Sequence, residues 1–70
     1  MAMFETDSTG NVIATAVRRE LLRLARLEEE RAATEAATVP YWAPHPSSVQ
    51  GHRAAALVLR TEADHFLAAS

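Results

Sequence analysis

The sequence predicts an all-α protein, a two-helix antiparallel hairpin with a proline-rich elbow that completes a four-helix bundle by dimerisation. The 70 residues include fifteen alanines and seven arginines but only two glycines, a composition that favours helices. Apolar residues recur every three or four positions on both sides of residues 39–46. Those eight residues, VPYWAPHP, contain all three prolines and so separate two helical segments.

Residues 1–11 are predicted to form a flexible N-terminal arm. The segment TDSTGN at residues 6–11 is rich in turn-forming residues, and Asn11 or Ser8 can cap the helix that follows. A short β-hairpin over residues 4–15, FETDSTGNVIAT, is the alternative. An isolated two-stranded ribbon is only marginally stable in water, which favours the arm.

The first helix is predicted over residues 12–38. Four apolar side chains share one of its faces at steps of four, four and three, namely Ile13, Val17, Leu21 and Leu24. Beyond Leu24 the same face continues through Glu28, Arg31 and Glu35 and becomes polar. Propensity alone does not stabilise such a helix in water, so the apolar stripe must be covered by another element.

Residues 39–47 are predicted to form a stiff elbow, followed by the second helix over residues 48–69. Proline lacks a backbone donor and disfavours helical geometry in the residue before it, so Pro40 ends the first helix. Tyr41 and Trp42 are expected to plug the open end of the hairpin, where the two helices diverge. The alternative is that these aromatic rings anchor a partner protein, as such residues do in binding hot spots.

Three apolar residues, Leu22, Leu57 and Val58, lie off the predicted contact faces. A pair of helices forms a single layer, whereas stable domains have two layers around a core. The chain also has no cysteine, so no disulfide or thiolate zinc site can supplement its small core. These features predict a homo-oligomer, most simply a dimer, in which Leu22, Leu57, Val58, Tyr41 and Trp42 bind a partner.

His52 is expected on the apolar face of the second helix, near the polar end of the first. Folding back about the elbow sets residue 35 level with about residue 50, so His52 can meet Glu35 or Arg31. A histidine in such a place is predicted to be a hydrogen-bonded packing residue.

The motif EADH places Glu62 and His65 three residues apart on one helix face, the spacing of ligands in di-iron carboxylate bundles. Together, LEEERAATEAATVPYW and EADH resemble in outline the small two-helix ferritin-like proteins. The resemblance implies a di-metal carboxylate site shared between hairpins. In the expected register, however, Glu20 is the only acid near Glu62 and His65. No metal site is therefore predicted, and Glu20, Glu62 and His65 are kept as the alternative.

A second alternative is a small nucleic-acid-binding regulator. Four arginines, Arg18, Arg19, Arg23 and Arg26, gather in the first half of the first helix and could follow phosphates. The net charge of −2, and the acidic run that follows the arginines, favour an ordinary solvated helix instead.

The sequence contains no nucleophile turn and no phosphate-binding glycine loop, so a non-enzymatic protein without cofactors is predicted. We expect it to bind another protein as an adaptor, inhibitor or assembly component. Without a membrane span or a secretory leader it is expected in the cytoplasm. The absence of lysine suits a GC-rich coding sequence, chromosomal or phage-encoded.

Overall fold

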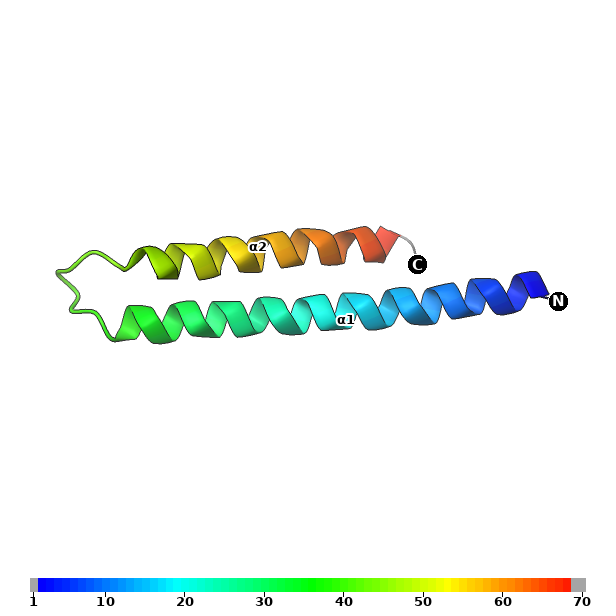
Figure 1. Ribbon diagram of the computed structural model, residues 1–70, viewed down its shortest axis with the longest axis horizontal. Helices are drawn as coiled ribbons and strands as arrows, with labels where there is room; N and C mark the ends of the chain where they lie inside the picture. Colours follow the sequence, from blue (N-terminus) through cyan, green and yellow to red (C-terminus); the bar gives the residue numbers. More distant parts are fainter. Residues whose placement is uncertain (1, 69–70) are drawn as a thin grey trace.

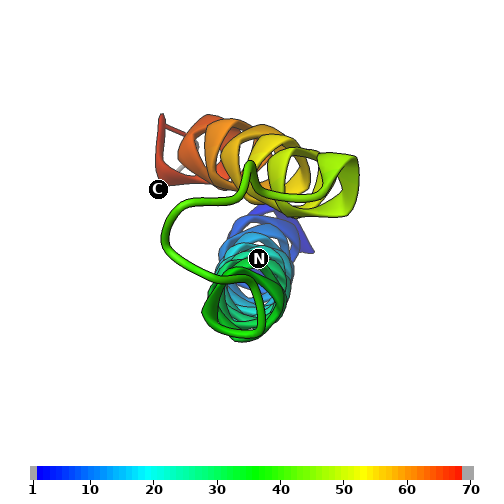
Figure 2. The same ribbon diagram turned by 90° about the vertical axis from the view of Figure 1, so that its left-hand side faces the viewer.

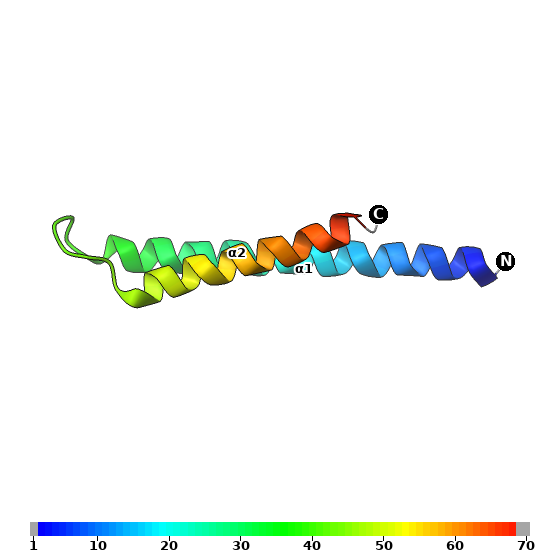
Figure 3. The same cartoon turned by 90° about the horizontal axis from the view of Figure 1, so that it is seen from above.

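The computed structural model describes residues 2–68, and the side chains of residues 10–66. Two helices, α1 (Ala2–Ala37) and α2 (Ser47–Ala68), lie antiparallel and side by side (Figures 1 and 3). Figure 2, along the long axis, shows one helix stacked on the other as a single layer. No strand occurs between residues 2 and 68, so the prediction of an all-α protein is confirmed.

Helix α1 begins at Ala2, which corrects both predictions for the N-terminal segment. Residues 2–11 are helical, neither the arm predicted for residues 1–11 nor the alternative β-hairpin. Turn-forming residues cost less than about 1 kcal/mol each in a helix interior, and an established helix grows by one hydrogen bond per residue. The cluster TDSTGN is therefore too weak a signal to stop the helix.

Tight backbone turns close α1 and open α2. The amide groups of Thr38 and Val39 donate to carbonyl groups three residues earlier, at 3.1 and 3.2 Å. Ala43 then donates to the Pro40 carbonyl group at 3.0 Å, which makes residues 40–43 a β-turn. A matching bond from Val49 to the Pro46 carbonyl group, also 3.0 Å, opens α2 at Ser47, one residue before the predicted start.

The core between the helices consists mainly of alanine. Among residues 10–66, five side chains are buried, and they follow a spacing of seven within each helix: Ala25 and Ala32 in α1, and Val49, Ala56 and Ala63 in α2. A repeat of seven keeps one narrow stripe of each helix against its partner. Alanine on both stripes allows a close approach of the two backbones.

The predicted apolar stripe of α1 is only partly correct. Val17, Leu21 and Leu24 are half-buried beside the alanine stripe, whereas Ile13 is exposed. Steps of four carry the stripe around α1, so Ile13 points away from the line of Ala25 and Ala32, whereas its neighbour Ala14 is half-buried. Because α1 has 36 residues and α2 only 22, the N-terminal part of α1 extends beyond the end of α2 (Figure 1).

Candidate interaction surfaces and the polar cluster

The elbow carries the most exposed aromatic side chains of the described residues. Tyr41 is 100% exposed and Trp42 is 75% exposed, so the predicted plug is wrong. The two residues occupy the central positions of the β-turn from Pro40 to Ala43, which is closed by its own backbone hydrogen bond. Side chains at the corner of such a turn project away from the helices that it joins.

The outer face of α2 carries the second exposed apolar group. Leu57 is 67% exposed and Val58 is 62% exposed, as expected for residues off the contact face. Leu22 differs from the prediction because it is half-buried. It lies three residues before Ala25, close enough to the contact stripe for α2 to cover part of it.

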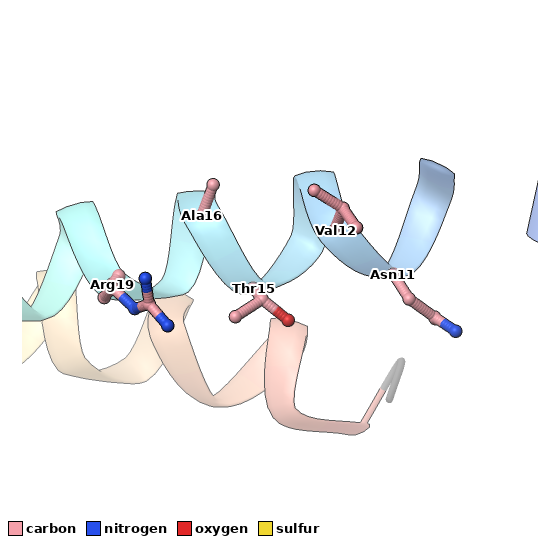
Figure 4. Close-up of a pocket in the computed structure, with 5 residues that line it drawn as sticks. All are labelled: Asn11, Val12, Thr15, Ala16 and Arg19. Carbon is pink, nitrogen blue, oxygen red and sulfur yellow. The ribbon is translucent and has the colours of Figure 1, made fainter. Parts of the chain in front are cut away.

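A shallow groove of about 340 Å³ lies on α1 near the point where α2 ends (Figure 4). Its lining residues all come from α1: Asn11, Val12, Thr15, Ala16 and Arg19. Figure 4 shows Thr15 on the side of α1 toward α2 and Ala16 on the opposite side. Small-molecule sites enclose most of the ligand surface, so a groove on one helix does not form such a site.

Four polar side chains form a cluster between the helices near the elbow. His52 of α2 lies between two carboxylates of α1, with Nδ1 at 2.5 Å from Glu28 and Nε2 at 3.2 Å from Glu35. Ser48 donates its hydroxyl hydrogen to Glu35 at 2.5 Å. On the outer side, Arg31 donates to Glu28 at 3.4 Å. The cluster therefore joins the two helices through His52 and Ser48.

The contacts of this cluster favour a charged His52. The hydrogen bond with Glu28, followed by the one with Glu35, raises the pKa of His52 above its ordinary value of 6.5, although partial burial acts in the opposite direction. The hydrogen bond from Ser48 is the main reason why the pKa of Glu35 is lowered, with His52 adding to the effect. A doubly protonated imidazole ring donates to both carboxylates at once.

The predicted meeting of His52 with Glu35 is confirmed, whereas its contact with Glu28 was not predicted. Glu28 and Glu35 are seven residues apart in the sequence, and His52 is seven residues before Leu59. The seven-residue repeat is the signal that sequence reasoning missed. A search for this repeat, instead of for a broad apolar face, would have placed Glu28 in the contact between the helices.

The polar cluster predicts a maximum of thermal stability in mildly acidic solution. A raised pKa of His52 stabilises the folded state fully below pH 6.5, and this contribution is lost as the pH rises through the folded-state pKa. The lowered pKa of Glu35 stabilises the folded state above about pH 4.5, and this contribution is lost as the pH falls through its folded-state value. The melting temperature should therefore be highest between these limits and fall toward pH 9.

Circular dichroism melts at fixed protein concentration between pH 4 and 9 measure this dependence. His52→Gln should lower the melting temperature near pH 5.5 and flatten the alkaline side of the profile. The control is His45→Gln in the exposed elbow, which should retain the wild-type profile. An unchanged alkaline slope in His52→Gln would contradict the role given to His52.

The alternative metal ligands do not converge within one chain. Glu20 forms a bidentate pair with Arg23 on α1, and His65 lies 3.4 Å from Glu62 on the exposed side of α2. Within residues 2–68, no three potential ligands form a group that could hold a metal ion. Glu28 and Glu35 meet opposite nitrogen atoms of His52, so these carboxylates do not share a common ligand position with the ring.

The four arginines of α1 do not form a single exposed stripe. Arg18 is half-buried, and its buried Nε atom has no hydrogen-bond partner among the described residues. Arg23 is paired with Glu20. Arg19 and Arg26 remain exposed without an ion pair to another described residue. The helix therefore presents a mixed charged surface here, with one acid among its cations.

No protein-family model, curated protein or solved structure matches the chain. Neither helix, over the part that the structure describes, has the length and apolar character needed to cross a membrane.

Proposed function

We propose that the protein is a small non-enzymatic helical module for protein–protein interaction that acts as a homo-oligomer. In this proposal two hairpins pack into a four-helix bundle, and the exposed elbow binds another protein. The module serves as an adaptor, inhibitor or assembly component. The observation that carries the proposal is the exposure of large apolar side chains on a single-layer fold. Of the six exposed among the described residues, four lie in the elbow and on α2, namely Tyr41, Trp42, Leu57 and Val58.

The two exposed groups suit two kinds of contact. Leu57 and Val58 lie on a regular helix, whose face can pack against a copy of itself. Tyr41 and Trp42 lie in a hydrogen-bonded turn beside Pro40, where little backbone freedom remains to be lost on binding. Rigid aromatic anchors of this kind dominate the energy of many interfaces.

Trp42→Ala is expected to leave folding unchanged and to weaken binding to the partner protein. Because Trp42 is largely exposed, its removal should change the free energy of unfolding by less than about 0.5 kcal/mol. Loss of a hot-spot tryptophan typically costs about 2 kcal/mol or more of binding energy, which is roughly a thirtyfold loss of affinity. Pull-down from the native host with wild-type and Trp42→Ala baits, followed by titration of the captured protein, measures the loss.

The matched control is His45→Ala, a second exposed elbow residue, which should retain both stability and binding. Tryptophan emission of the free wild-type protein should have a maximum typical of a water-exposed ring. A blue-shifted emission in the free protein, or a large fall in melting temperature in Trp42→Ala, would show that Trp42 is a core residue and would refute its role as an anchor.

A further inference from the structure

The outer face of α2 carries several small and apolar side chains, and no other element among the described residues covers it. Gly51, Ala54, Leu57, Val58 and Thr61 are all exposed and follow one side of the helix. None of these five residues is charged, although His65 lies on the same side one turn beyond Thr61, 3.4 Å from Glu62. Thr61 donates its hydroxyl hydrogen to the Leu57 carbonyl group at 2.9 Å, so it needs no polar partner outside the helix.

Gly51, on the same side of α2, is a further indication of a packing surface. A glycine inside a helix costs about 1 kcal/mol relative to alanine, so its presence calls for a packing reason. A Cβ atom built at Gly51 would meet nothing within 4 Å. No contact among the described residues therefore requires glycine here, whereas a second helix packed closely against this face would.

The charges beside this face are arranged for self-association in one orientation. Asp64 follows Arg53 by eleven residues, which is about three helical turns. The directions of the two residues around the helix axis therefore differ by only about 20°, and both lie on the same flank of the face. Both side chains are exposed, and neither forms an ion pair with another described residue. The midpoint of the two positions lies beside Val58, within this face.

We infer that α2 packs against α2 of a second copy, antiparallel and about a twofold axis beside Val58. This inference rests on the proposed homo-oligomer and places its contact on the side of α2 opposite α1, so that the four helices of the dimer lie in a row instead of around a shared core. In this register each Arg53 lies opposite Asp64 of the partner subunit, so two identical ion pairs flank the apolar centre. Leu57 lies level with the space between the partner's Val58 and the partner's Thr61, the geometry in which side chains interdigitate.

The parallel arrangement is disfavoured by the same charges. A twofold axis parallel to the helices sets the Arg53 side chains of the two subunits on opposite flanks of the contact, and the Asp64 side chains likewise, so the parallel arrangement forms no pair between Arg53 and Asp64. The antiparallel arrangement pairs these opposite charges at both ends. Charge thus selects the orientation, and the apolar centre supplies the contact area.

Charge reversal tests this interface. Arg53→Asp and Asp64→Arg should each weaken self-association by about tenfold or more at low salt, because two attractive pairs become two repulsive ones. An equimolar mixture of the two variants should associate as tightly as the wild-type protein, since the heterodimer restores both opposite-charge pairs. Sedimentation equilibrium in low salt measures the dissociation constants, and circular dichroism verifies that each variant is helical.

The control is Arg26→Asp, a charge reversal at an exposed position of α1, which should self-associate like the wild-type protein. Wild-type-like association of both single variants, or failure of their mixture to associate, would overturn the α2 interface while leaving a homo-oligomer built on another face. A wild-type protein that remains a single 7.6 kDa species at all concentrations would instead refute the proposed homo-oligomer itself.

Discussion

Ala32→Leu should destabilise the folded protein by about 1–3 kcal/mol, the usual cost of adding methylene groups to a packed core. Ala32 is only 2% exposed and belongs to the alanine stripe that faces α2. A leucine at this position must separate the two helices or adopt a strained rotamer. A chain of 70 residues has a total stability of roughly 4–10 kcal/mol, so the expected loss is a large fraction of it.

The matched control is Ala33→Leu, one residue further along the same helix and exposed. Alanine and leucine have similar helix propensities, so this change should shift the free energy of unfolding by less than about 0.5 kcal/mol. Urea denaturation at one fixed protein concentration measures both variants, because association contributes to apparent stability. Equal losses in the two variants would show that the alanine stripe is not the packed core.

Val49→Ala should destabilise the protein by about 2 kcal/mol. Val49 is fully buried at the first turn of α2 and is the largest side chain buried to that degree among residues 10–66. Its truncation removes two methyl groups from the contact with α1 and leaves a cavity beside the elbow, and both effects lower stability. The elbow end of the hairpin should therefore loosen first in this variant.

Val12→Ala is the control for this change, because it makes the same truncation at a position of α1 that is 68% exposed. The exposed truncation should be neutral or slightly stabilising, since alanine is the better helix former. Urea denaturation of both variants gives the difference, and hydrogen exchange of amide groups near residues 37–49 reports local opening. A similar small effect of the two truncations would contradict the placement of Val49 in the core.

The two helical segments and the break between them follow from local chemistry. Alanine and arginine favour helices wherever they lie in the sequence, and Pro40 interrupts a helix because its ring removes a donor and restricts the preceding residue. The meeting of His52 with Glu35 could also be predicted, because residues on either side of a short turn have a nearly fixed register. These features depend on neighbours in the sequence and not on distant packing.

The start of α1 could not be predicted in this way. Turn-forming residues at 6–11 have only weak preferences, and the growth of an existing helix outweighs them. The exposure of Tyr41 and Trp42 was also out of reach, because it depends on the turn that the elbow adopts after Pro40. Large aromatic rings are often buried, but a composition cannot indicate whether the surrounding turn leaves space for them.

The sequence by itself determined that there are two helical segments and that prolines separate them. It also determined that the apolar residues are too numerous to fit on one contact face. Only the tertiary structure decided that alanine, and not leucine, forms the centre of that face. Two helices approach most closely where both present small side chains, so Ala25 and Ala32 are buried while Leu21 and Leu24 lie beside them. This packing also leaves Leu57 and Val58 exposed to solvent, because α1 covers only one side of α2.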